Sequence, residues 1–135
     1  MTKAIRDAWW HRNDLELRDN ELVFANRAVG TLAAQFDSPA FFYSAARITE
    51  KLNGLHSALN TAGFAGRYKI HYAMKANRFA PLLTHLKTTG LCGIDACSPA
   101  EAEHAISCGF DASEISFTAT SLSQKDLHQL SRLKE

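Results

Sequence analysis

The chain has 135 residues, of which 46% are hydrophobic and 21% are charged, an ordinary composition for a folded domain that buries a core. Its 15 Lys and Arg residues against 14 Asp and Glu residues leave a formal charge of +1, which excludes the strong positive field that gathers nucleic acid or an anionic membrane. No apolar run approaches the ~20 residues that span a bilayer, and Met1 to Trp10 carry charge where a signal peptide is apolar. We therefore expect a cytoplasmic protein that binds neither nucleic acid nor a membrane.

The first part of the chain predicts a β-hairpin followed by a helix. Leu15 to Arg18 alternates apolar and polar residues, Asp19-Asn20 supplies a turn, and Glu21 to Phe24 resumes the extended pattern. Ala28 to Phe36 is compatible with a helix. The Trp9-Trp10 pair before the hairpin is more typical of packing within its own domain than of a docking surface.

A short strand and a long helix are expected next. Ala40 to Tyr43 has the aromatic density of a strand, and Ser44 is a typical N-cap residue for the helix that follows. From Ala45 to Asn60 the apolar residues recur at intervals of four, three and four, which predicts one face of an amphipathic helix. These residues are Ile48, Leu52, Leu55 and Leu59. Gly63 and Gly66 are expected to end the helix.

The rest of the chain repeats a strand and a helix three times. The expected strands are Tyr68–Lys75, Leu91–Cys97 and Ile115–Thr118, and the expected helices are Pro81–Thr89, Pro99–Cys108 and Ser123–Lys134. Three successive units with short connections predict a parallel sheet of the α/β class, with the helices in one outer layer if the sheet curves into a barrel. Because a closed barrel of eight units needs about 250 residues, we expect this sequence to hold the first three units of an incomplete barrel.

The three cysteines have spacings that match no zinc or redox dithiol pattern. They are Cys92, Cys97 and Cys108. We expect reduced, mostly buried thiols and no metal. A structural zinc site stays open if histidines such as His71, His85 or His104 converge in space.

Lys75 closes the first strand of the repeat. Alternation places His71, Ala73 and Lys75 on one face, with Lys75 at the carboxyl end, where βα proteins assemble their active sites. A neutral, desolvated amine in such a place can attack an aldehyde and form a Schiff base. Position and residue type alone favour a plainer interpretation, in which Lys75 is a strand-end cation that reaches water along its aliphatic stem.

Asp95 ends the second strand, and the residues after it predict the start of a helix. Ser98 at the N-cap, Pro99 at the first helical position and Glu101 at the third form a capping box, which explains these residues structurally. Asp95 has no such structural role. Since neighbouring strands lie about 5 Å apart, we expect its carboxylate to lie near Lys75 and to pair with the amine.

Two motifs together resemble those of a known family. Tyr72 to Asn77 resembles the Y-A-[VLM]-K-[AC]-N lysine motif of the fold-type-III pyridoxal-phosphate decarboxylases, the group of diaminopimelate, ornithine and arginine decarboxylases. Asp95, Ser98 and Glu101 match the D-x-x-S-x-x-E pattern of that group, and Glu101 to Phe110 resembles its continuation. The two motifs in this order are far more specific than either alone.

The resemblance implies a cofactor and a set of residue roles. Lys75 would hold pyridoxal 5'-phosphate as an internal aldimine, Ala73 would line the floor under the cofactor, and Asp95 would be a partner of the lysine. Glu101 would support the same corner of the cofactor site. The protonated cofactor ring is an electron sink for the carbanion left when carbon dioxide departs.

The resemblance also implies a domain organisation and a function. Residues 40–135 would be part of a pyridoxal-phosphate-binding TIM-like (β/α)8 barrel of the alanine racemase type, and residues 1–39 would belong to a separate β-domain. The protein would be a homodimeric carboxy-lyase that acts on a small amino acid, with diaminopimelate favoured and lysine as its product. Because the phosphate loop and the carboxy-terminal domain of the family lie beyond Glu135, this chain would hold Lys75 without catalysing by itself.

Departures from the family motifs keep two alternatives open. Phe117 to Ser121 stands where diaminopimelate decarboxylases have a T-G-N-x-K-like segment, which leaves the subfamily open. Alanine racemases share the fold type, but their lysine motif continues as A-N-A-Y-G-H-G, whereas Arg78 to Pro81 follows Asn77 in this chain. The other alternative is a non-catalytic protein of the same fold that binds pyridoxal phosphate.

Overall fold

A computed structural model describes residues 12–37 and 39–134 of the chain. The chain divides into two compact units, residues 1–47 and 48–135, and each is described by itself. The Trp9-Trp10 pair lies outside the described residues, and the division expected between residues 39 and 40 stays a prediction. Within the described ranges, no helix is both long and apolar enough to cross a membrane.

The first unit is built on a β-hairpin. Strands β1 (Leu15–Arg18) and β2 (Glu21–Phe24) pair antiparallel, as the sequence predicts. Asp19 and Asn20 have φ angles of 49° and 65°, the left-handed conformations that a two-residue type I′ turn requires. Asn and Asp adopt these angles more readily than other residues with a Cβ atom, so the turn residues fix the register of the hairpin.

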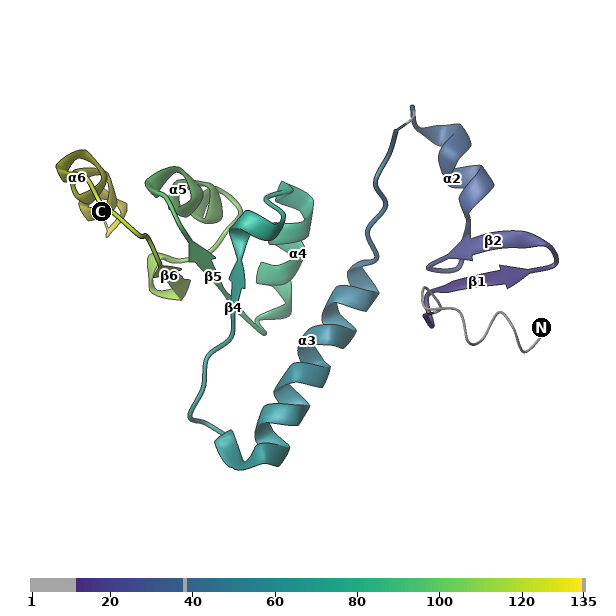
Figure 1. Cartoon of the computed structure of the whole chain (residues 1–135), viewed down its shortest axis with the longest axis horizontal. Coiled ribbons are helices and arrows are strands. Elements are labelled where there is room, and N and C mark those ends of the chain that lie inside the picture. Colours follow the sequence, from purple (N-terminus) through teal and green to yellow (C-terminus); the bar gives the residue numbers. More distant parts are fainter. Residues whose placement is uncertain (1–11, 38, 135) are drawn as a thin grey trace. The chain divides into compact units, whose positions relative to one another are not determined.

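A short third strand and a helix complete the first unit (Figure 1). Strand β3 (Arg27–Ala28) pairs antiparallel with β2, and helix α2 (Val29–Gln35) follows it directly. The helix expected over Ala28 to Phe36 is therefore confirmed. Val23 of β2 and Leu32 of α2 are 7% and 9% exposed, so the small core of this unit lies between the hairpin and the helix.

The strand predicted over Ala40 to Tyr43 is wrong. These residues join neither of the sheets that the described residues form. Phe41 is 83% exposed, and Phe42 packs edge to face against Phe36 with ring centroids 5.8 Å apart. Aromatic residues favour strands because they pack on cross-strand neighbours. In this segment the aromatic contact is made with a residue close in sequence, and no strand pairing results.

Helix α3 (Ala45–Leu59) leads into the second unit (Figure 1). It begins where the sequence predicts because the Ser44 hydroxyl oxygen accepts a hydrogen bond from the Arg47 amide, at 3.2 Å. The helix runs into a π-helical turn at Asn60–Phe64. Gly63 takes a φ angle of 83° there, a left-handed conformation that favours glycine and stops the helix.

Three parallel strands alternate with three helices in the rest of the second unit. The strands are β4 (His71–Ala73), β5 (Gly93–Ala96) and β6 (Ile115–Phe117), in that spatial order. The helices are α4 (Ala80–Thr89), α5 (Pro99–Ser107) and α6 (Gln124–Ser131). Both pairs of neighbouring strands are parallel, which confirms the predicted α/β class.

Helices α4 and α5 cover one face of this sheet (Figure 1). Met74, which follows β4, and Ile94 of β5 are fully buried. They share a core with Leu83 and Leu86 of α4 and with Ala105 of α5. The hydrophobic core of the second unit therefore lies between the sheet and these two helices, and it takes every second side chain of the central strand.

The strand register places a second, more polar set of residues on the opposite face. Parallel pairing sets Ala73 beside Asp95 and Asp95 beside Ser116. Side chains alternate along a strand, and Ile94 and Ala96 are buried against the helices, so Asp95 points to the other side of the sheet. This polar face is where the strand ends can bring reactive side chains together.

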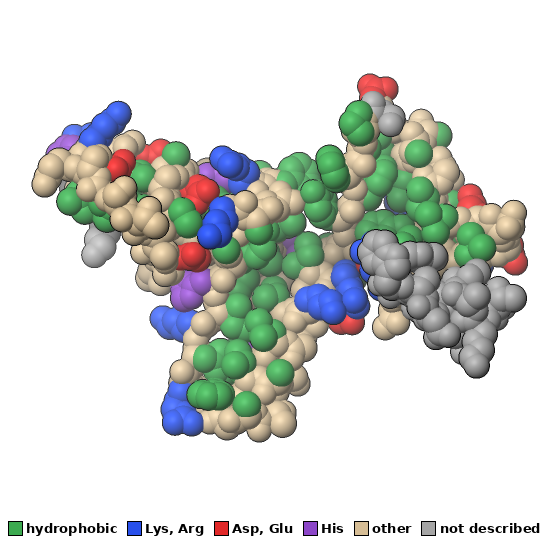
Figure 2. All heavy atoms as spheres, in the orientation of Figure 1, with side chains coloured by type: hydrophobic (Ala, Val, Ile, Leu, Met, Phe, Trp, Pro, Cys, Tyr) green, Lys and Arg blue, Asp and Glu red, His purple; other side chains and the backbone are tan. Residues whose placement is uncertain are grey.

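Part of the predicted apolar face of helix α3 packs against other residues of this chain. Ile48 and Leu52 pack against the core of the second unit. Leu55 is 47% exposed, and Phe64 in the π-helical turn is 49% exposed. Figure 2 shows hydrophobic side chains gathered over α3 and the segment that leads to β4.

Gly93 allows β5 and β6 to approach each other closely. A Cβ atom at this position would lie 2.2 Å from the Glu114 carbonyl oxygen and 2.9 Å from His71 Cδ2. Because the backbone oxygen cannot move aside without disturbing β6, we expect Gly93→Ala to lower the free energy of unfolding by about 1–3 kcal/mol, the usual cost of overpacking. Urea unfolding of the two proteins measures this difference.

Gly54→Ala in α3 is the matched control for this prediction. A Cβ atom at Gly54 meets nothing within 4 Å, so the substitution only removes a glycine from the interior of a helix. It should raise the free energy of unfolding by about 0.5–1 kcal/mol. If both substitutions shifted stability in the same direction, the close approach at Gly93 would not be the cause.

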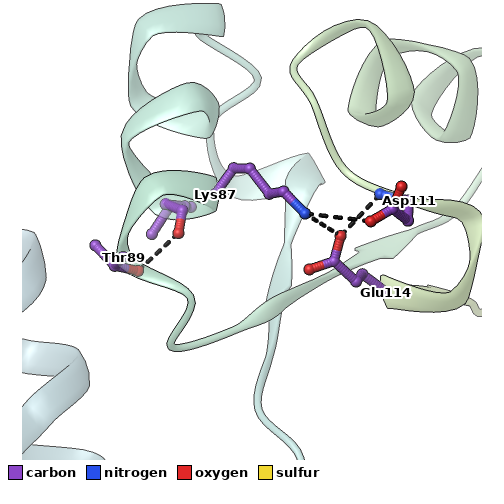
Figure 3. A network of polar contacts seen from close by, with 5 residues as sticks. Lys87, Thr89, Asp111 and Glu114 are labelled. Carbon is purple, nitrogen blue, oxygen red and sulfur yellow. Dashed lines mark hydrogen bonds and ion pairs between the residues drawn. The ribbon is translucent and has the colours of Figure 1, made fainter.

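Lys87 of α4 connects this helix to the segment that precedes β6 (Figure 3). Its ammonium group forms an ion pair with Glu114 and lies 3.5 Å from the Asp111 carboxylate. The Glu114 carboxylate also accepts a hydrogen bond from the Asp111 amide, at 2.8 Å. The hydrogen bond with Lys87 is the main reason that the pKa of Glu114 lies below its usual value, and the same bond raises the pKa of Lys87.

The lowered pKa of Glu114 predicts a stabilising contribution that disappears in acid. A carboxyl group with a lower pKa in the folded state stabilises the protein above its unfolded pKa, about 4.3 for Glu. This contribution is lost as the pH falls through the folded pKa. Glu114→Gln should therefore lower the urea midpoint at neutral pH and match the unsubstituted protein near pH 2, about two units below the unfolded value.

Glu103→Gln on α5 is the control, since Glu103 is exposed. It should leave the urea midpoint unchanged at both pH values. An effect of Glu114→Gln that persisted in acid would show that the amide fails for steric reasons rather than through loss of the ion pair.

Candidate active site

The segment that carries Lys75 leaves the strand earlier than the sequence predicts. Strand β4 ends at Ala73, and Met74–Ala76 form a single turn of 3₁₀ helix. The Met74 side chain is fully buried in the core, whereas Lys75 is exposed. The predicted strand, which continues through Lys75, is therefore too long. The chain turns after Ala73 because Met74 is buried and the Asn77 amide donates a hydrogen bond to the Met74 carbonyl oxygen, at 3.1 Å. The exposed Lys75 side chain agrees with the plainer interpretation of a strand-end cation that reaches water, and the amine is not desolvated in this chain.

Hydrogen bonds hold the residues that follow Lys75. The Tyr72 hydroxyl donates to the Asn77 carbonyl oxygen at 3.2 Å, and the Asn77 side-chain oxygen accepts from the Phe79 amide at 3.0 Å. His104 of α5 contacts the Arg78 carbonyl oxygen through Nε2, at 2.8 Å. These hydrogen bonds fix the backbone of residues 77–79, which follow the lysine.

Asp95 lies on the polar face of the sheet, in register with Ala73 of the neighbouring strand. Its Oδ1 atom accepts a hydrogen bond from the Thr118 hydroxyl, at 2.8 Å, across the carboxyl ends of β5 and β6. Among the described residues, Lys75 takes part in no ion pair, and Asp95 is bound to Thr118 instead. The pairing expected between Asp95 and Lys75 is therefore not formed in this chain: Asp95 lies beside Ala73 and binds Thr118, and the Lys75 side chain is exposed.

Ser98 and Glu101 organise the turn after β5. The Ser98 side chain accepts a hydrogen bond from the Glu101 amide at 3.2 Å, so the predicted N-cap is confirmed. The second half of the predicted capping box is wrong in one detail: the Glu101 carboxylate accepts from the Cys97 amide, at 2.8 Å, rather than from Ser98. Glu101 therefore fixes the residues immediately after Asp95.

The arrangement is suited to chemistry on an aldehyde. A primary amine at the carboxyl end of a parallel strand becomes a nucleophile when it is neutral. Ala73 has a small side chain and lies beside Asp95 in the strand register, and Thr118 adds a hydroxyl to the Asp95 carboxylate. An aldehyde cofactor with a flat ring fits this set of groups.

The histidines and cysteines that the structure describes do not converge on a metal site. Within residues 12–37 and 39–134, no three His, Cys, Asp or Glu side chains lie in a position to share a metal ion. His85 Nε2 lies 2.9 Å from the Thr49 hydroxyl. Burial raises the pKa of the Cys92 thiol, which keeps it in its unreactive protonated form.

Residues 45–134 match the model of the pyridoxal-binding domain of the pyridoxal-dependent decarboxylases. The chain belongs to this family. Its cofactor is pyridoxal phosphate, so the family and the cofactor expected from the two sequence motifs are confirmed. The match covers α3, the parallel sheet and all three helices that follow its strands.

The chain is also similar to individual proteins and solved structures. The chain is 30% identical over 115 residues to the diaminopimelate decarboxylase of Methanothermobacter thermautotrophicus, covering 84% of this chain and 26% of that protein. The crystal structure of AQ1208 from Aquifex aeolicus has a TM-score of 0.78 and 27% identity, over 90% of this chain and 29% of that one. The diaminopimelate decarboxylase of M. jannaschii in complex with L-lysine has a TM-score of 0.78 at 18% identity, over 90% of this chain and 28% of that one.

These similarities confirm the expected fold class. The second unit has the α/β architecture of the first βα units of the family's TIM-like barrel. The chain spans about a quarter of the length of the curated relative that it matches.

Thr118 and Asp95 should be energetically coupled. Thr118→Val removes the hydroxyl that donates to the Asp95 carboxylate and keeps the side-chain shape. In a double-mutant cycle of unfolding free energies with Asp95→Ala, we expect a coupling of about 0.5–1.5 kcal/mol, the value of one hydrogen bond. Thr120→Val with Asp95→Ala is the control cycle, because Thr120 is exposed two residues further along the chain. Equal coupling in the two cycles would contradict the specific contact.

Proposed function

We propose that the protein is a pyridoxal-phosphate-dependent amino-acid decarboxylase in which Lys75 binds the cofactor covalently. The observation that carries the proposal is an accessible primary amine at the carboxyl end of β4, within the stretch that matches a pyridoxal-binding domain. The same lysine lies in the Tyr72 to Asn77 motif that resembles the lysine motif of these decarboxylases.

The surrounding residues have distinct proposed roles. We assign Ala73 to the floor under the flat ring. We assign the Asp95 carboxylate, which is bound to Thr118 in this chain, to orienting the lysine amine once the cofactor is bound. Glu101 acts at a distance: its bond to the Cys97 amide keeps the turn after Asp95 in place. Pyridoxal phosphate supplies the electron sink that decarboxylation requires when it is bound.

We further propose diaminopimelate as the substrate, with carbon dioxide and lysine as products. The relative from M. thermautotrophicus is named a diaminopimelate decarboxylase, and the solved enzyme from M. jannaschii is a complex with L-lysine. A homodimer in the cytoplasm, with residues 1–39 in a separate β-domain, belongs to the same proposal. Ornithine, arginine and carboxynorspermidine are the competing substrates.

Lys75→Ala tests the proposed role of the lysine. In the protein expressed from its complete reading frame, this substitution should reduce release of carbon dioxide from diaminopimelate at least about a thousandfold, as expected when a covalent catalytic group is lost. Lys69→Ala is the matched control, because Lys69 is an exposed lysine just before β4, at the opposite end of the strand. It should retain activity close to that of the unsubstituted protein.

The same assay separates the alternatives. Racemisation of alanine without release of carbon dioxide would indicate a racemase, and cofactor binding with neither reaction would indicate a non-catalytic protein. Decarboxylation of ornithine or arginine in preference to diaminopimelate would contradict the proposed substrate. Full activity of the Lys75→Ala protein would contradict the proposed site.

A further inference from the structure

We propose that His104 is a positioning residue for Lys75. Its imidazole holds the Arg78 carbonyl group and thereby fixes the loop that carries the lysine (residues 75–79). This inference rests on the proposed role of Lys75 and extends it to a residue of a different βα unit. His104 lies within the Glu101 to Phe110 stretch, at a position where the family motif specifies no residue.

The contact between His104 and Arg78 has one chemically consistent form. Nε2 lies 2.8 Å from the Arg78 carbonyl oxygen, which can only accept a hydrogen bond, so Nε2 must carry a proton. The imidazole donates from Nε2 both in this neutral tautomer and in its charged form. On the other side of the ring, the Ser107 hydroxyl lies 3.4 Å from Nδ1 and is 2.7 Å from the His104 carbonyl oxygen.

The contact adds a support from another βα unit. Within its own unit the loop is also bound to α4, because the Leu82 and Leu83 amides donate to the Phe79 carbonyl oxygen, at 2.9 and 3.1 Å. The bonds from Tyr72 to Asn77 and from Phe79 to Asn77 join residues of β4 and of the loop, five and two positions apart. His104 is 26 positions away from Arg78. A long-range bond of this kind ties the loop to the next βα unit and removes motions that the local bonds allow.

Helix α5 is anchored well enough to act as the support. Ala102 and Ala105 are 2% and 0% exposed, so one side of the helix is fixed in the core. His104 is half-buried, and its contact with Arg78 lies at the surface. The imidazole thus transmits the position of a packed helix to the lysine loop.

The same helix also holds the segment that follows Asp95. Glu101 and His104 are three positions apart, so they lie on the same side of α5. Glu101 accepts from the Cys97 amide at 2.8 Å, and His104 donates to Arg78 at 2.8 Å. One helix therefore sets where the Lys75 loop lies relative to the end of the Asp95 strand.

The test compares three substitutions in the protein expressed from its complete reading frame. His104→Ala removes the donor, whereas His104→Gln places an amide N–H near the position of Nε2. His85→Ala is the matched control, because His85 is a partly buried histidine of α4 whose bond goes to Thr49. Two measurements are made on each: hydrogen exchange of the Asn77 and Phe79 amides without cofactor, and the rate at which added pyridoxal phosphate attaches to Lys75.

We expect His104→Ala to speed exchange of these two amides about three- to tenfold, the factor that one hydrogen bond supplies. The Ile94 amide in the central strand should be unaffected, which distinguishes loosening of the loop from general destabilisation. Attachment of pyridoxal phosphate should slow by a similar factor, and His104→Gln should restore both values. His85→Ala should change neither measurement.

Several results would overturn the inference. They are unchanged exchange at Asn77 and Phe79 in the His104→Ala protein, a matching increase at Ile94, or equal effects of His85→Ala. Faster exchange without any change in the rate of attachment would show that the bond only stabilises the loop. If the unsubstituted protein attached no pyridoxal phosphate at Lys75, the proposed function would fail, while the exchange measurement would still test the contact with Arg78.

Discussion

The site depends on the two-residue period of the parallel strands. Ile94 and Ala96 must face α4 and α5 to form the core, so the residue between them, Asp95, faces the other side of the sheet. Parallel pairing then sets Asp95 beside Ala73 and Ser116 at the carboxyl ends of their strands. Burial of the apolar face thus determines which side chains lie on the opposite face of the sheet, where they are available for chemistry.

Contacts with neighbouring segments then determine how the side chains at the strand ends are oriented. Met74 is drawn into the core immediately after β4, which turns the chain and leaves Lys75 exposed. The Thr118 hydroxyl holds Asp95 from the next strand, and Glu101 holds the Cys97 amide from α5. Asp95 and the turn that follows it are therefore both held by residues of other segments, as a preorganised site requires.

Much of this architecture can be predicted from the sequence because its signals are local. Asp19-Asn20 between two alternating runs predicts the hairpin, and Ser98 before Pro99 predicts the start of α5. Strand pairing is a non-local event, which explains why aromatic density alone gave a false strand at Ala40 to Tyr43. The length of β4 was also overestimated, since the pattern of Tyr68 to Lys75 does not show that Met74 turns into the core.

The site is predictable in part for the same reason. Lys75, Asp95 and Glu101 lie in recognisable motifs. Thr118 is distant in sequence from its partner Asp95, as is His104 from Arg78, and neither has a spacing that indicates a contact. The most direct measurement is borohydride reduction of the protein with bound pyridoxal phosphate, followed by peptide mapping of the labelled lysine by mass spectrometry. A single adduct on Lys75 is the predicted result. Labelling spread over surface lysines, with Lys75 unmodified, would contradict the assignment of the site.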